Sequence, residues 1–189
     1  MSGLQGRSFR VILLATAMLT LFAAASFSAE GNALRSQAEA GDAVAQYNLG
    51  VMYGKGVDVP RDDAEAIKWY RKAAEQGNVD AQLILGFMYG KGRGVLQDDA
   101  ESAKWVMKAA EQGDAKAQSF LGVMYGDGLG VPQDYVQSYF WSSLSVSSAS
   151  GKEDKDALET RDRVAKELTP AKIMEVQSMT REWEKTHPR

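Results

Sequence analysis

The sequence of 189 residues contains no cysteine and a single histidine, His187, near its carboxyl-terminal end. Without thiols, no disulfide framework can hold the fold, which therefore depends on packing alone. One histidine in the terminal tail leaves no histidine-based catalytic triad and no histidine-rich metal site. We expect a protein without catalytic residues, without a metal site and without a cofactor.

The sequence also lacks an excess of basic residues. It has 22 Lys and Arg against 25 Asp and Glu, which gives a formal net charge of −3 at pH 7. Nucleic acids and anionic membrane surfaces attract proteins that carry a basic face. We therefore expect neither of them as a partner.

Only one long apolar run is present, and it lies at the amino terminus. Arg7 and Arg10 precede the run, residues 11–25, and small residues follow it. This order is typical of a cleavable secretory signal, whereas a membrane span needs ~20 strongly apolar residues. We expect cleavage after Ala25, with Ser28 as a second option and an uncleaved anchor as the alternative. Removal of the two arginines takes the formal charge from −3 to −5, and the product is a periplasmic or secreted protein without stable membrane insertion.

The rest of the chain contains three segments that repeat with the same phase. Gly41, Gly77 and Gly113 lie 36 residues apart, and other residues recur at that spacing. A fixed period between about 20 and 50 residues is typical of stacked supersecondary units. The recurring residues are Tyr53, Tyr89 and Tyr125, then Asp62, Asp98 and Asp134, then Trp69, Trp105 and Trp141.

Each repeat is predicted to contain two antiparallel helices, A and B, joined by a glycine-rich turn. Asp62 and Glu65 have the spacing of a capping box at the start of helix B. Gln137 takes the place of the glutamate in the third repeat, which argues for capping rather than for an acid–base pair. Gly54, Gly90 and Gly126 are expected to end helix A, because glycine enters the left-handed region without penalty. We expect helix A over residues 42–53, 78–89 and 114–125, and helix B over residues 62–76, 98–112 and 134–147.

Amphipathic segments flank the repeats and predict caps for the stack; at the carboxyl-terminal end, a docking helix for a partner is the alternative. Residues 32–40 resemble the end of a helix B, and residues 153–168 predict a further charged helix. Thr169 and Pro170 then predict the start of a last helix. The expected division is residues 1–25, signal peptide; 26–41, partial capping helix; 42–77, 78–113 and 114–149, the three repeats; and 150–189, carboxyl-terminal capping helices and tail.

The repeats resemble the Sel1-like repeat family, which is related to the tetratricopeptide repeat. Helix A reads Ala-Gln-x-x-Leu-Gly-x-Met-Tyr-Gly, and helix B ends in Trp-x-x-Lys-Ala-Ala-Glu-Gln-Gly; the third copy departs from this pattern after Trp141. The resemblance implies an all-α, right-handed α-solenoid of three helix-turn-helix repeats, serving as an adaptor or regulator. A cysteine-rich branch of the family is linked to β-lactam binding, and a chain without cysteine gives no support for that activity.

Positions that differ between the repeats predict the partner-binding surface, because recurring positions are used in stacking. On helix A these positions follow the i, i+3, i+4, i+7 spacing of one helical face. By resemblance to tetratricopeptide arrays, this face lines a concave groove that binds a peptide or helix. Ile84 and Phe120 are left open between groove and core. The predicted partner-binding residues are Val44, Tyr47, Val51, Asp80, Leu83, Phe87, Lys116, Ser119 and Val123.

These features together predict a non-catalytic scaffold, adaptor or regulator of the bacterial cell envelope. Its partner is expected to be another envelope protein or a peptide, and the chain is expected to be monomeric. Binding of a cell-wall glycan or a small ligand is the alternative, and a hydrolase is the least favoured. Because Trp and Tyr stack on sugars, an exposed Trp105 would favour the glycan.

Overall fold

The computed structural model describes residues 28–148 and 154–187; the predicted signal peptide lies outside these ranges. The described residues form helices and no strand. The helices are α2 (Ala29–Glu39), α3 (Ala43–Lys55), α4 (Asp63–Glu75), α5 (Val79–Lys91), α6 (Asp99–Glu111), α7 (Ala115–Asp127), α8 (Tyr135–Ser148), α9 (Lys155–Val164), the short 3-10 helix η1 (Ala165–Glu167) and α10 (Pro170–Thr186).

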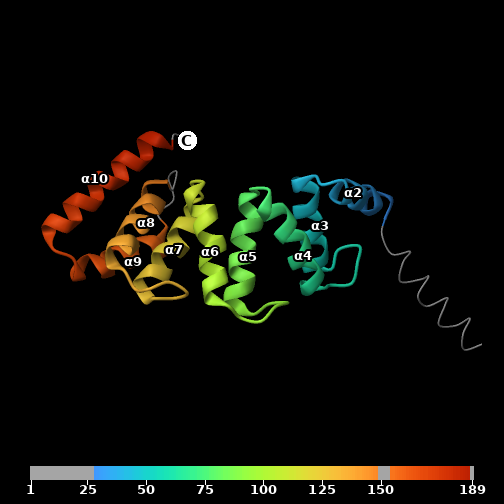
Figure 1. Cartoon of the computed structure of the whole chain (residues 1–189), viewed down its shortest axis with the longest axis horizontal. Coiled ribbons are helices and arrows are strands. Elements are labelled where there is room, and N and C mark those ends of the chain that lie inside the picture. The colour runs from blue at the N-terminus through green and yellow to red at the C-terminus, as the bar shows by residue number, and fades with distance from the viewer. Residues whose placement is uncertain (1–27, 149–153, 188–189) are drawn as a thin grey trace, which may run out of the picture.

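The helices stack in one row, as Figure 1 shows. Each repeat pairs a helix A with its helix B, as α3 with α4, α5 with α6 and α7 with α8. Each helix B then packs on the helix A that follows it, so the stack continues from one repeat to the next. The predicted all-α solenoid of three repeats is confirmed.

Side-chain caps start the helices as predicted, but the capping box is only half formed. Asp62 accepts a hydrogen bond from the backbone N–H of Glu65 (2.9 Å), and Asp98 and Asp134 act in the same way. The N–H of Asp62 donates to the carbonyl of Tyr53 (2.9 Å), so Glu65 has no cap to reach back to. The Glu65 carboxylate pairs with Lys68 instead.

Helix A ends two residues later than predicted. Gly54 lies inside α3, and the left-handed residue that follows the helix is Gly56, with φ 70°. The prediction that Gly54, Gly90 and Gly126 end helix A is therefore wrong. These glycines face helix B closely instead: a Cβ on Gly90 would lie 3.1 Å from the Ser102 hydroxyl.

The core lies between the two helix layers and uses the recurring residues. Trp69, Trp105 and Trp141 are buried, as are the leucines of helix A. Gly86 lies inside α5, where glycine costs ~1 kcal/mol relative to alanine. A Cβ there would overlap Val106 of α6, so this glycine permits the close approach of the two helices.

A ladder of buried glutamines joins successive repeats. Gln82 of α5 donates from Nε2 to the carbonyl of Ala74 (3.0 Å), at the end of the preceding helix B. Its Oε1 accepts from Nε2 of Gln112 in the following helix B (2.7 Å). Each rung therefore ties three helices together. The equivalent rungs are Gln46 with Ala38 and Gln76, and Gln118 with Ala110 and Ser148.

The turns between helix A and helix B contact the preceding repeat. Gly94 and Gly130 occupy equivalent positions with positive φ (72° and 70°). A Cβ on Gly94 would lie 2.6 Å from the carbonyl carbon of Asp63, and one on Gly130 would overlap the carbonyl oxygen of Asp99. The first repeat has Asp58 at this position, with φ 59°.

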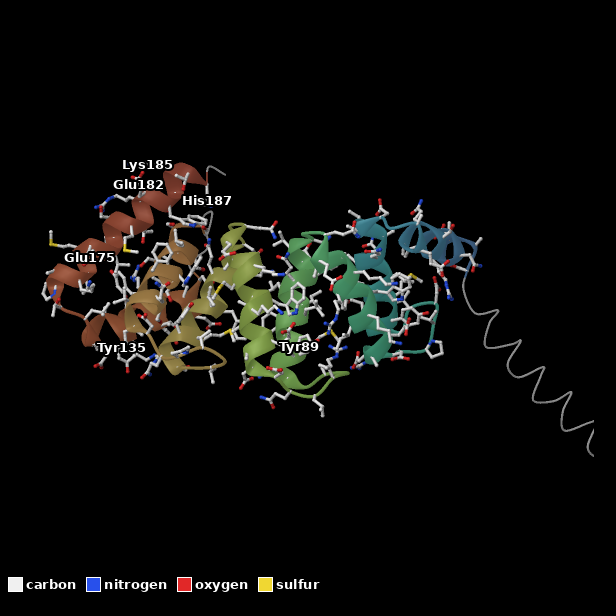
Figure 2. The ribbon with its side chains drawn as sticks, viewed as in Figure 1. Tyr89, Tyr135, Glu175, Glu182, Lys185 and His187 are labelled. Carbon is white, nitrogen blue, oxygen red and sulfur yellow. The ribbon has the colours of Figure 1, made fainter. Side chains whose placement is uncertain are left out.

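The carboxyl-terminal helices cover the last repeat. α9 packs on α8 and α7, in the place that a fourth helix A would take, and buries Ala157 and Val164. Thr169 caps α10 and Pro170 is its first residue, as predicted. α10 packs on α8 through Val176, while Figure 2 shows Glu175, Glu182 and Lys185 along its outer side.

We expect Gln82→Leu to lower the free energy of unfolding by about 1–2 kcal/mol, because it removes the buried hydrogen bonds to the Ala74 carbonyl and from the Gln112 amide. Chemical denaturation monitored by circular dichroism measures this difference. The control is Gln37→Leu on the exposed side of α2, with an expected change under about 0.5 kcal/mol. Equal effects of the two substitutions would contradict a structural role for the ladder.

We expect Gly130→Ala to destabilise the protein more than Gly77→Ala does. Both glycines have positive φ, where an L side chain costs about 1–2 kcal/mol, but nothing lies within 4 Å of a Cβ on Gly77. The overlap with the Asp99 carbonyl adds about 1–3 kcal/mol for Gly130→Ala. Denaturant unfolding of the two variants gives the difference, and a zero difference would contradict the close contact between repeats.

Candidate partner-binding groove

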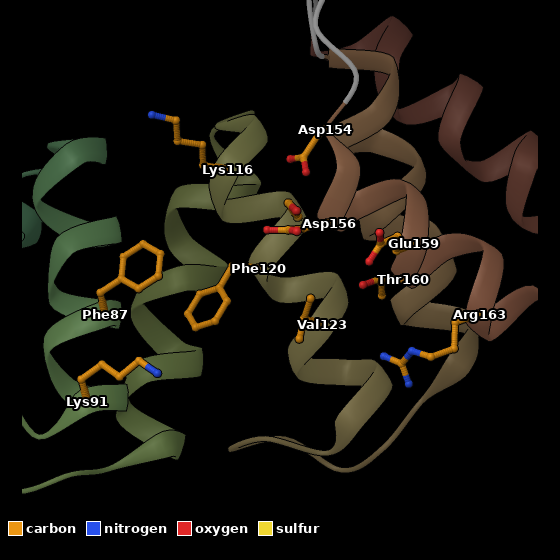
Figure 3. A pocket seen from close by; sticks show the side chains of 11 residues that line it. Phe87, Lys91, Lys116, Phe120, Val123, Asp154, Asp156, Glu159, Thr160 and Arg163 are labelled. Atoms are coloured by element: carbon orange, nitrogen blue, oxygen red, sulfur yellow. The ribbon is translucent and has the colours of Figure 1, made fainter.

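Two adjacent cavities open along the helix A side of the stack. The larger is about 650 Å³ and lies between α5, α7 and α9 (Figure 3), and the smaller is about 320 Å³ and lies between α3, α4 and α5. Phe87 and Lys91 line both cavities, so we treat them as one surface, the helix A groove. Its other lining residues are Ser119, Phe120, Val123, Lys116, Asp154, Asp156, Glu159, Thr160 and Arg163 in the larger cavity, and Gly54, Lys55, Tyr70, Ile84, Met88 and Arg93 in the smaller.

Phe87 is the most prominent apolar side chain of the groove. It is 43% exposed, and its ring stacks on that of Phe120 with the centroids 4.8 Å apart and the planes 17° from parallel. The larger cavity also brings together Lys116, Ser119 and Val123, three more of the predicted residues. Phe120, which the sequence left between groove and core, lines the groove.

Leu83 and Ser119 are less accessible than a partner-binding role requires. Leu83 is only 8% exposed and belongs to the core cluster that includes Val106 and Leu121. It lies on the side of α5 that faces the neighbouring helices, so the prediction that Leu83 lies on the open face is wrong. Ser119 is 7% exposed, and its side chain forms part of the floor of the larger cavity.

The remaining predicted residues lie outside both cavities. Val44 is 61% exposed and Asp80 is exposed, at the amino-terminal ends of α3 and α5. Tyr47 is half-buried with its ring 5.9 Å from that of Tyr70, and Val51 packs partly against the same core. Burial, and then the charge of Asp80, raises the pKa of Tyr47. None of these four residues lines a cavity with Phe87.

The sequence did not reveal that α9 forms a wall of the groove. Asp154, Asp156, Glu159, Thr160 and Arg163 line the larger cavity, although they lie outside the repeats. Their amphipathic helix predicted a cap, and stacking as a fourth helix A places this cap beside α7. One signal in the sequence could have indicated this wall. The third repeat departs from the repeat pattern at its end, so the array stops there and a helix outside the repeats has to cover α7.

Charges on the groove are separated between its walls. Lys91 and Lys116 come from α5 and α7, whereas Asp156 and Glu159 come from α9 (Figure 3). Arg163 forms an ion pair with Asp127 (2.8 Å) at the edge of the larger cavity. The groove therefore presents opposite charges to the two sides of a bound molecule.

The smaller cavity is bordered by an ion-paired arginine, a neutral phenol and two lysines. Arg93 forms an ion pair with Asp63 (2.9 Å) and donates to the carbonyl of Gly54 (3.1 Å). Hydrogen bonds from Arg93 and then from Arg61 hold the pKa of the Asp63 carboxyl well below its usual range. Burial raises the pKa of Tyr70 to about 12, so its phenol stays protonated at neutral pH. Because Lys55 and Lys91 also line this end of the groove, it offers an apolar surface beside positive charge.

Other kinds of site find little support in residues 28–148 and 154–187. They contain no group of three His, Asp or Glu side chains placed to hold a metal ion. None of their helices has the length and apolar character needed to cross a membrane. The three repeat tryptophans are buried, so none of them forms an exposed platform for a sugar ring.

Comparison with known structures gives the same fold for several bacterial proteins. The protective antigen c5321 of uropathogenic Escherichia coli, which displays an SLR fold, is 34% identical with a TM-score of 0.69, over 82% of this chain and 32% of the antigen. The chain thus spans about a third of that protein. A Sel1 repeat protein from Oxalobacter formigenes is 37% identical with a TM-score of 0.62, over 69% of this chain and 95% of that protein. Cysteine-rich protein B of Helicobacter pylori, at 20% identity, shares the fold, with a TM-score of 0.52 over 70% of this chain and 96% of its own.

The family assignment rests on the three repeats themselves. Comparison with curated protein sequences gave no significant match. The Sel1 repeat matches residues 43–78, 79–114 and 115–148, which is more than half of the chain and coincides with the three helix pairs. The chain belongs to the Sel1 repeat family.

Proposed function

We propose that the chain is a non-catalytic interaction protein of the bacterial cell envelope and binds a peptide segment of another protein in the helix A groove. The observation that carries this proposal is the exposed Phe87, which stacks on Phe120 where the two cavities meet. An aromatic surface exposed inside a groove is stabilised when a partner covers it.

The shape of the groove favours a peptide over a compact small molecule. Its two cavities of about 650 and 320 Å³ adjoin at Phe87 and Lys91 and follow successive A helices. A segment that crosses several helices is recognised through alternate apolar anchors and flanking polar contacts. The helix A groove supplies the anchors from Phe87, Phe120 and Val123, and charged walls beside them.

Relatives support the class of function. Sel1 repeats typically form scaffolds for protein–protein interaction. The Escherichia coli relative is described as a protective antigen, which agrees with a location where an immune system meets it. This comparison supports an exported protein, together with the charged and apolar leader pattern of residues 1–25.

A photo-crosslinking amino acid placed at Phe87 in living cells is expected to trap a discrete protein adduct, because this position lies at the centre of the groove. The matched control places the same amino acid at Leu96, which is apolar and 89% exposed but lies in the loop outside the groove. Gel mobility and mass spectrometry identify the adducts. The same adducts from both positions, or none from Phe87, would contradict binding in the groove.

Export is tested by the mass of the mature chain. Protein purified from the envelope or medium of the expressing bacterium is expected to begin at Ser26, because cleavage after Ala25 places small residues at the cleavage site. Intact mass spectrometry gives the first residue directly. A full-length chain found only in the cytoplasm would contradict this part of the proposal.

A further inference from the structure

One turn of α9 aims two carboxylates into the larger cavity. Asp156 and Glu159 are three residues apart, so they lie on the same face of the helix, and both are exposed. Figure 3 shows them on the wall of the cavity opposite Phe87. Within the described parts of the chain, neither carboxylate forms an ion pair.

A second observation comes from a hydroxyl at the same place. The Thr160 side chain follows Glu159, lines the cavity and is only 6% exposed, and Figure 3 shows its hydroxyl on the cavity side. Among residues 28–148 and 154–187 this hydroxyl has no hydrogen-bond partner. It is therefore free to bond to a ligand that enters the cavity.

The neighbouring cations do not neutralise this wall. Arg163 is held by Asp127 at 2.8 Å, and Figure 3 shows the end of Lys116 pointing away from α9. Lys91 belongs to α5, on the wall of the cavity opposite α9. The α9 wall therefore keeps a net negative charge beside an apolar surface.

We propose that this wall is a subsite for a basic side chain, arginine or lysine, of the bound peptide. The inference rests on the proposed function: a bulky apolar residue of the peptide covers Phe87 and Phe120, and the adjacent basic residue reaches α9. Its charged N–H groups donate to the carboxylates of Asp156 and Glu159 and to the Thr160 hydroxyl. Such charge-assisted hydrogen bonds are about twice as strong as neutral ones.

The chemistry of the wall favours a side chain over a bare metal ion. Two carboxylates and one hydroxyl supply few oxygen ligands, whereas calcium takes about 6–8. A basic side chain instead brings several donors on an apolar stem, and this stem packs against the aromatic rings. An apolar surface beside an acidic wall thus fits two adjacent peptide residues, one bulky and apolar and the other basic.

The test uses peptides selected on the protein itself. Random 12-residue peptides displayed on phage are selected on the chain beginning at Ser26, and binders that also bind a folded Phe87→Ala variant are removed. We expect the remaining peptides to share an arginine or lysine next to a bulky apolar residue. The best peptide, and an analogue with norleucine in place of the basic residue, are the probes for calorimetry.

The decisive variant is Asp156→Asn/Glu159→Gln, which keeps the size of both side chains and removes both charges. We expect it to weaken binding of the basic peptide about tenfold or more, and to leave the norleucine analogue within about twofold. The control variant Asp162→Asn/Glu175→Gln removes the same charge from exposed positions outside the cavity and is expected to leave both affinities unchanged. Circular dichroism verifies that both variants are folded.

The outcomes separate the two proposals. The α9 subsite would be overturned if the selected peptides depend on Phe87 but lack a basic residue. It would also be overturned if a basic peptide binds the decisive and control variants equally. Either result would leave the proposed peptide binding in the groove unchanged. Selection that returns no Phe87-dependent peptide would overturn the proposed function and the subsite with it.

Discussion

The structure depends on buried glutamine side chains that bond the end of one helix B to the next repeat. The carbonyls of Ala38, Ala74 and Ala110 already accept a backbone N–H from the turn that follows, and each has a second lone pair for a glutamine amide. Gln46, Gln82 and Gln118 donate to these carbonyls of the preceding helix; Gln46 and Gln82 accept from the glutamine after the following helix B, and Gln118 accepts from Ser148. Since each glutamine bonds to two other helices, it fixes their relative heights as well as their contact. The three A helices therefore present equivalent residues at equivalent places, and a continuous groove becomes possible.

Residues that recur between the repeats pack the helices, and residues that differ between the repeats line the groove. Small residues and tryptophans that recur, such as Gly86 and Trp105, bring the helices together and fill the space between them. Phe87 and Lys91 lie on the free side of α5, where packing does not dictate their identity. The groove ends at α9, which takes the position of another helix A but carries carboxylates in place of apolar groups. The cap of the stack and the charged wall of the groove are thus one helix.

The repeat phase made the fold predictable, including both layers of helices and the caps of α9 and α10. The end of helix A was missed because Gly54 and Gly56 are both glycines, and only the position of helix B decides which one faces it. Leu83 was misplaced because residues 80, 83, 84 and 87 cover a wide arc of the helix, and the part of this arc that holds Leu83 faces the core. The acidic wall could not be found from the repeats, since α9 has no counterpart to compare with. Its place follows from packing on α7 and α8, which is a tertiary fact.

Asp58 changes how the first turn contacts the helix before it. At the equivalent places, Gly94 and Gly130 leave room for the start of the preceding helix B against the turn. Asp58 adopts the same left-handed conformation but carries a side chain, which accepts a hydrogen bond from the Ser28 hydroxyl (3.1 Å). Ser28 is also the side-chain cap of α2, the helix that packs on α3. The first turn therefore holds its neighbour through a side chain, whereas the later turns hold theirs through close contact between backbones.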